Sequence, residues 1–154
     1  MRHWLMKSEP DEFSILDLRQ RGRAPWDGVR NYQARNFMRD DMRAGDLALF
    51  YHSSCAEPAA AGVARIAGAA RPDPSAWDRK SPYFDPKSSV DNPIWCLVEV
   101  AFAEMFPSPV TLVAMKADPA LRGMLVARRG MRLSIQPVSA EHFQHVLKLG
   151  RRKQ

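Results

Sequence analysis

Cysteine is scarce in this chain of 154 residues, which contains only Cys55 and Cys96. Two cysteines are too few for a disulfide framework, so we expect the protein to fold in a reducing compartment, the cytoplasm. The two residues also lack Cys-x-x-Cys spacing and any histidine–asparagine context. A nucleophilic role for either thiol is therefore not expected.

Long apolar runs are absent as well. No stretch approaches the roughly 18 consecutive apolar residues that a helix needs to cross a bilayer. Residues 1–4 also lack the apolar segment of a secretory signal. We therefore expect a soluble domain that does not associate with a membrane.

Metal and cofactor motifs are also missing. The histidines are scattered, and only His142 and His145 share a helix face, with no cysteine and no third ligand near them in sequence. No glycine-rich turn between a strand and a helix occurs, as a doubly wound nucleotide-binding fold would need. The sequence therefore predicts neither a metal site nor a cofactor.

Positive charge is the clearest excess. The formal net charge is +6 and the isoelectric point is about 9.7, which favours a polyanionic partner because lysine and arginine release counterions from phosphates. Hydrophobic and charged fractions of 45% and 26% are ordinary for a globular protein. The length predicts a single domain over residues 1–150, followed by a basic tail at 151–154, and leaves the oligomeric state open.

The most informative stretch is residues 26–36, which combines aromatic, arginine, asparagine and glutamine side chains. Such a mixture is poor material for a core, because every buried donor would need a partner. Asp27-Gly28 predicts a turn, and Asn31 predicts the N-cap of a helix that continues to about Arg43. We expect the Trp26 indole to stay accessible beside this helix N-terminus, as part of a pocket that stacks a flat polar ligand.

The rest of the sequence predicts short helices and five strands. It also predicts a long ordered loop at 71–93 that contains a helical turn at 75–78. The strands are expected at 3–8, 47–53, 60–70, 94–106 and 133–138, the fourth ended by Pro107 and Pro109. The helices are expected at 14–20, 31–43, 111–116, 119–124 and after Ser139. Because strands and helices do not alternate as βαβ units, the sequence predicts an α+β fold, a small mixed β-barrel of five to six strands with peripheral helices.

Several motifs resemble those of the EVE domain family, and the resemblance covers nearly the whole chain. They are Trp4-Leu5-Met6-Lys7-Ser8-Glu9-Pro10, residues 25–36, Phe50-Tyr51-His52-Ser53, Lys80-Ser81-Pro82-Tyr83 and Arg128-Arg129-Gly130. The resemblance implies a domain of the PUA-like superfold that recognises a modified base in nucleic acid, either DNA or RNA. The chain is also distantly similar to YTH domains, which read methylated adenine in RNA, at Lys7-Ser8 and Trp26.

A non-enzymatic domain that captures a modified base, with modified cytosine favoured, is therefore the predicted function. Trp26 would stack the base, and Glu9 would accept a hydrogen bond from an exocyclic amine. The predicted base pocket comprises Lys7, Ser8, Glu9, Trp26, Asp27, Arg30, Asn31, Tyr32, Tyr51 and Ser53. The predicted phosphate-binding residues are Arg35, Arg39, Lys80 and Lys87.

Two other classes of function stay open. An amidohydrolase acting on a modified cytidine, as in ASCH relatives of this fold, would use Lys7 and Glu9, which share one face of an extended segment. The proline-rich loop at 71–93 would instead serve a protein-interaction module. We assign no catalytic residue. An alternative interpretation of Trp26 is that it is an ordinary core residue.

Overall fold

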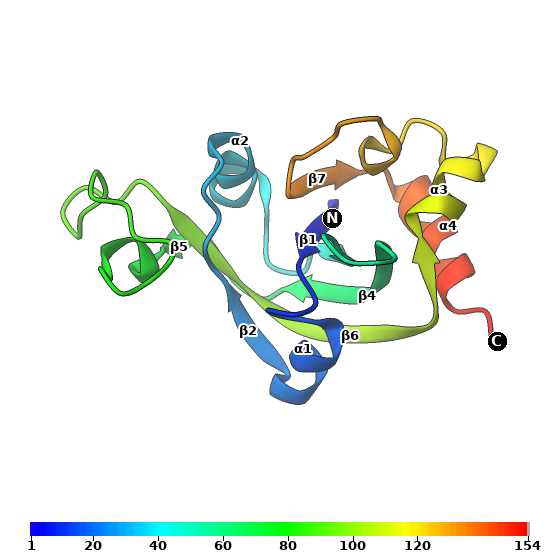
Figure 1. Cartoon of the computed structure of the whole chain (residues 1–154), viewed down its shortest axis with the longest axis horizontal. Helices are drawn as coiled ribbons and strands as arrows, with labels where there is room; N and C mark the ends of the chain where they lie inside the picture. Colours follow the sequence, from blue (N-terminus) through cyan, green and yellow to red (C-terminus); the bar gives the residue numbers. More distant parts are fainter. Residues whose placement is uncertain (154) are drawn as a thin grey trace.

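A computed structural model describes residues 1–153, within which seven strands form one open sheet (Figure 1). The strand order is β2-β6-β4-β3-β1-β7, and β5 pairs with β6. The strands are β1 (His3–Ser8), β2 (Arg23–Trp26), β3 (Leu47–His52), β4 (Ala59–Ile66), β5 (Arg71–Pro72), β6 (Cys96–Thr111) and β7 (Ile135–Val138).

Short helices surround the sheet. They are α1 (Ile15–Arg21), α2 (Tyr32–Asn36), α3 (Leu112–Ala117) and α4 (Ala140–Gly150), with the π-helical turn η1 (Phe37–Asp41) and the 3₁₀ turns η2 (Pro74–Trp77), η3 (Pro119–Leu121) and η4 (Leu125–Ala127). The predicted α+β class is confirmed. The loop that contains η2 and the helices α3 and α4 lie at opposite ends of the long axis (Figure 1).

The predicted closed barrel is wrong, because β2 and β7 form two separate edges of the sheet. Each edge strand contains a proline, Pro25 in β2 and Pro137 in β7. Proline has no N–H to donate to a further strand, so these positions suit an edge. The short strand β2, which carries Trp26, was not predicted from the sequence.

The longest strand, β6, continues to Thr111, past the prolines that were expected to end it. Its pairing with β4 shifts between Gly62, opposite Met105, and Ala60, opposite Val110. Pro107 and Pro109 lie within this irregular stretch, where the ladder needs no N–H from them. The prolines therefore mark a bulge in β6.

Two neighbouring interior strands, β1 and β3, pair in parallel, so their carboxyl ends lie at the same end of the sheet. Lys7 is opposite Tyr51, and the Ser53 N–H donates to the Ser8 carbonyl at 2.9 Å. This pairing joins two polar strand ends that are more than forty residues apart in the sequence.

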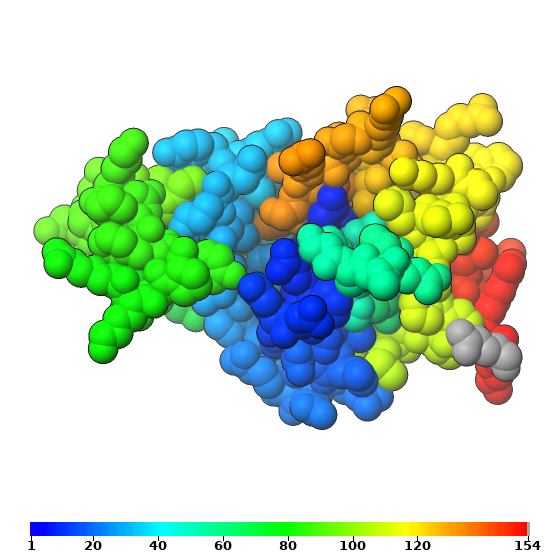
Figure 2. All heavy atoms as spheres, in the orientation of Figure 1, coloured from blue at the N-terminus to red at the C-terminus, as the bar shows by residue number. Residues whose placement is uncertain are grey.

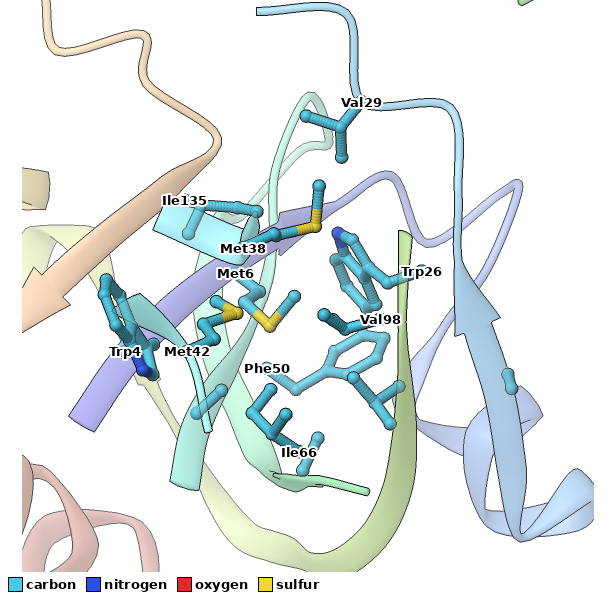
Figure 3. Close-up of a cluster of buried hydrophobic side chains, with 14 of the residues drawn as sticks. Trp4, Met6, Trp26, Val29, Met38, Met42, Phe50, Ile66, Val98 and Ile135 are labelled. Carbon is cyan, nitrogen blue, oxygen red and sulfur yellow. The ribbon is translucent and has the colours of Figure 1, made fainter. Parts of the chain in front are cut away.

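Alternation along β1 and β3 places two cores on opposite faces of the sheet. Trp4, Met6 and Phe50 belong to the first core, which α1, α2 and η1 cover and which Figure 3 shows. Leu5 and Leu49 belong to the second core, which α3 and α4 cover. The sheet is therefore held rigidly from both sides.

Helix caps confirm several local predictions. The Asn31 side chain accepts a hydrogen bond from the Ala34 N–H, and the Ser139 side chain accepts one from the His142 N–H. The helical segment after Asn31 becomes π-helical at Phe37 and ends at Asp41, slightly before the predicted Arg43.

The predicted basic tail begins just after α4, and its first residue, Arg151, pairs with Glu104 at 2.6 Å. Residue 154 lies outside the described residues, and the division into a domain and a tail stays a prediction. None of the helices within residues 1–153 has the length and apolar character to cross a membrane.

Candidate nucleic-acid interface

A cavity of about 850 Å³ opens where the carboxyl ends of β1 and β3 meet the turn after β2. Its volume lies within the range of about 300–1,000 Å³ that is usual for small-molecule sites. The segments that line it, coloured blue, light blue, turquoise, green and orange in Figure 2, lie next to one another on the face shown. Eight of the predicted base-pocket residues line it: Lys7, Ser8, Glu9, Trp26, Asp27, Arg30, Tyr51 and Ser53.

One side of the cavity is the strand-end wall, formed by Lys7, Ser8, Glu9, Tyr51 and Ser53. The Lys7 ammonium donates to the Met131 carbonyl at 3.0 Å, and the Ser8 hydroxyl donates to the Phe13 carbonyl at 2.6 Å. Burial lowers the pKa of Lys7 and raises the pKa of Tyr51 to about 12. Glu9 lines the cavity and is exposed.

The Trp26 indole is less accessible than the sequence suggested. Trp26 is only 8% exposed, and its ring packs edge-on against the Phe50 ring, with ring centroids 5.4 Å apart (Figure 3). Pairing of Trp26 with Val98 in the β2–β6 ladder directs the ring into the core. The remaining exposed part still lines the cavity, so Trp26 is both a core residue and part of the site.

The opposite side is the loop wall, formed by Asp27, Gly28, Arg30 and Tyr83. Gly28 has a φ of +75°, and a Cβ at this position would lie 2.7 Å from the Tyr83 ring. The Arg30 guanidinium donates from Nε to the Tyr83 carbonyl at 2.9 Å and lies 5.7 Å from the Tyr83 ring centroid. A residue far along the chain is thereby seated against the turn after Trp26.

A buried carboxylate, Asp73, supports the loop wall from behind. Its side chain is 0% exposed and accepts from the Gly28 N–H at 2.9 Å, from Arg30 Nη1 at 3.1 Å and from the Ser75 hydroxyl at 2.6 Å. Burial alone would raise the pKa of Asp73, but the hydrogen bonds from Ser75, Gly28 and Arg30 outweigh it and hold the pKa below its ordinary value. Asp73 therefore stays ionised and ties loop 71–93 to the site.

Tyr83 is the main site residue that sequence reasoning missed. Burial raises the pKa of its hydroxyl, and the nearby carboxylates of Glu12, Asp27 and Glu9 raise it further. The signal was present in the Lys80–Tyr83 motif, but nothing local indicates which way this aromatic points. Other lining residues that were missed are Glu12, Phe13, Arg21, Pro25, Val29, Ser54, Pro58, Leu112, Met131, Arg132 and Ser134.

Two predicted pocket residues lie outside the cavity lining. The Asn31 side chain is used as a helix cap. Tyr32 stacks on Trp95 with ring centroids 4.9 Å apart, and the Arg35 guanidinium lies 4.9 Å from the Tyr32 ring centroid. The structure therefore separates this aromatic pair from the cavity.

Among the predicted phosphate-binding residues, the two arginines bind acceptors within the protein and the two lysines are exposed. Arg35 donates to the Ile94 carbonyl at 3.0 Å, and Arg39 pairs with Asp40 at 2.8 Å. Lys80 and Lys87 lie exposed on loop 71–93. A phosphate-binding role for these four residues stays a prediction. Within residues 1–153, no group of three His, Cys, Asp or Glu side chains is placed to hold a metal ion.

Residues 2–149 match the model of the EVE domain, a class of domain that the motifs and the fold already indicated. The chain belongs to the EVE domain family. It is 42% identical to thymocyte nuclear protein 1 of Homo sapiens over 166 residues, which cover 96% of this chain and 73% of that protein.

Solved structures agree with this membership. A protein from Pseudomonas syringae superposes with a TM-score of 0.92 and 47% identity, over 96% of this chain and 98% of that one. The human THYN1 protein, in complex with DNA that contains 5-methylcytosine, superposes with a TM-score of 0.92 and 40% identity, and each chain is covered completely, at 100%.

The expected cytoplasmic location is contradicted by these comparisons. Relatives from Homo sapiens and Gallus gallus carry the name thymocyte nuclear protein 1, which points to a nuclear protein. The scarcity of cysteine indicates a reducing environment, and this property does not distinguish the cytoplasm from the nucleus.

Proposed function

We propose that this chain is a non-enzymatic domain that binds nucleic acid and takes a modified cytosine into the cavity between the strand-end wall and the loop wall. Its open sheet is then a variant of the PUA-like superfold. The observation that carries the proposal is one cavity in which aromatic rings, Trp26 and Tyr83, lie beside the polar ends of β1 and β3. The human relative bound to 5-methylcytosine DNA supports it.

Stacking supplies only part of the binding energy. Stacking of a base on an aromatic ring contributes about 1–3 kcal/mol, and extruding a base from a duplex costs a few kcal/mol. Edge hydrogen bonds must therefore supply the surplus. Glu9, exposed at the strand-end wall, is placed to accept from the N4 amino group of cytosine, as carboxylates do.

Discrimination for the methyl group is expected to be modest. Burying one added methyl contributes about 0.8 kcal/mol, which corresponds to a few-fold in affinity. The proposal therefore predicts preference for a modified duplex and not absolute specificity.

A titration of two otherwise identical duplexes, one with a single 5-methylcytosine and one with cytosine, tests the proposal. We expect a few-fold tighter binding of the methylated duplex. Glu9→Gln should weaken binding of both, because it removes the charged acceptor. Equal affinity of the native protein for the two duplexes would rule out recognition of this modification.

The hydrolase alternative has one observation in its favour: Lys7, whose pKa burial lowers, lines the same cavity as Glu9. The hydrogen bond from Lys7 to the Met131 carbonyl favours a structural role for this amine. We expect no conversion of N4-acetylcytidine to cytidine in prolonged incubation with the protein. Turnover that is lost in Lys7→Met would reverse this assignment.

A further inference from the structure

Three arginines lie between η4 and β7: Arg132, which lines the edge of the base cavity without an assigned role, and Arg128 and Arg129, which lie outside it. We propose that all three bind the phosphates of the nucleic-acid strand next to the captured base. This inference rests on the proposed function, because the phosphates in question are those that flank the captured base.

The position of these arginines is the first argument. Arg132 lines the base cavity, whereas Arg128 and Arg129 line a second hollow of about 590 Å³. The arginine segment therefore contributes side chains to the lining of both hollows. A strand that leaves the base cavity toward the second hollow crosses all three side chains.

Charge is the second argument. The second hollow is lined by four basic side chains, Lys116, Arg122, Arg128 and Arg129, and by one carboxylate, Asp118. Asp118 is already paired with His145 at 2.7 Å. The hollow therefore presents a surplus of positive charge to an anionic partner.

The third argument is that the three guanidiniums are uncommitted. Arg128, Arg129 and Arg132 are exposed, and within residues 1–153 their side chains form no hydrogen bond or ion pair. Arg35 and Arg39, by contrast, already donate to protein acceptors. A phosphate can bind the first group without displacing an existing partner.

The backbone that carries these arginines is fixed in place, which is the fourth argument. The Met131 N–H donates to the Arg128 carbonyl in a turn. The Lys7 ammonium donates to the Met131 carbonyl at 3.0 Å, and the Lys7 backbone N–H donates to the Ser134 carbonyl at 2.8 Å. Arg128, Arg129 and Arg132 lie on this one short segment, so their guanidiniums are presented together to neighbouring phosphates of one strand.

The test removes the three charges together, in Arg128→Ala/Arg129→Ala/Arg132→Ala. Binding of the methylated and unmodified duplexes is measured at several salt concentrations. We expect weaker binding of both, with the slope of log K against log salt reduced by about 0.9 for each arginine. The preference for the methylated duplex should be retained, because phosphate contacts carry no base information.

A charge-matched control removes Arg19, Lys148 and Arg65, which are exposed and lie outside both hollows. Arg19→Ala/Arg65→Ala/Lys148→Ala should change the salt slope by less than one. Arg128→Lys/Arg129→Lys/Arg132→Lys should restore most of the slope, since charge is kept.

The two proposals fail in distinguishable ways. A native protein that prefers the methylated duplex, combined with a triple alanine variant that matches its control in salt slope, would overturn the phosphate assignment alone. A native protein without preference between the duplexes would overturn the proposed function and this inference with it.

Discussion

The two walls of the base cavity contain similar side chains but are held in place by different means. The strand-end wall continues directly from β1 and β3, whose hydrophobic residues are buried on both faces of the sheet. The loop wall lies outside the regular strands, and polar contacts contribute much of its support. Three of these contacts converge on one carboxylate, Asp73, which is 0% exposed.

This difference teaches where the site is vulnerable. Removing one contact from the strand-end wall leaves the sheet intact, because packing spreads the support over many residues. Removing the Asp73 carboxylate takes away the hydrogen-bond acceptor of the Gly28 N–H, of Arg30 and of Ser75 at once. We therefore expect the whole loop wall to lose its position. The predictions below use this contrast.

The largest effect is expected from Asp73→Ala. It leaves the mostly buried Arg30 without its carboxylate, and breaking such a pair costs about 3–5 kcal/mol. Urea unfolding should show this loss. Asp91→Ala, in the same loop, should change the free energy of unfolding by less than about 0.5 kcal/mol, because Asp91 is exposed and, within residues 1–153, its side chain forms no hydrogen bond. Similar losses of unfolding free energy in the two variants would contradict the special role of Asp73 in holding the loop wall.

Gly28→Ala should have the next largest effect. Its φ of +75° strains any other residue by about 1–3 kcal/mol, and the added Cβ would lie 2.7 Å from the Tyr83 ring. Gly22→Ala is a matched control, because its φ is +78° and no atom lies within 4 Å of the added Cβ. Both variants should lose stability, but only Gly28→Ala should also lose affinity for the methylated duplex. Loss of affinity in both would show that backbone strain alone is responsible.

A smaller effect, confined to binding, is expected from Tyr83→Ala. Loss of one stacking surface should weaken binding of the methylated duplex by about 1–3 kcal/mol, as measured by calorimetry or fluorescence anisotropy. Phe84→Ala removes a neighbouring ring that does not line the cavity, and it should leave affinity unchanged. If both variants bind like the native protein, Tyr83 does not contact the base.

The smallest effect concerns pH. The pKa of Asp73 lies below its ordinary value of 3.8 in the folded state, so the unfolded state binds more protons in acid. The stability that Asp73 contributes is therefore complete well above pH 3.8 and is lost as pH falls through the folded-state pKa. The difference in unfolding free energy between the native protein and Asp73→Asn should stay constant near neutral pH and shrink in acid. A difference that grows in acid would contradict the assigned shift.

Much of the local structure could be predicted because it depends on near neighbours. Asn31 and Ser139 cap helices through N–H groups three residues away, and such spacings are visible in the sequence. The continuation of β6 past Pro107 and Pro109 could not be predicted, because it depends on a register shift opposite β4. The open sheet likewise depends on which strands become edges.

The site divides in the same way. The polar ends after β1 and β3 were visible, but their meeting requires parallel pairing of strands from separate parts of the chain. The burial of Trp26 follows from its pairing with Val98, and the contribution of Tyr83 follows from a loop that Asp73 and Arg30 tie to the turn after β2. None of these contacts leaves a periodic signal in the sequence.

The sequence by itself determined the family, the helix caps, the positive charge and the polar residue types around the cavity. Only the tertiary structure decided which of those residues share the cavity and which arginines remain free for a partner. The physical reason is distance along the chain. Asp73 and Gly28 are 45 residues apart, and their hydrogen bond exists only once the sheet has brought their two segments together.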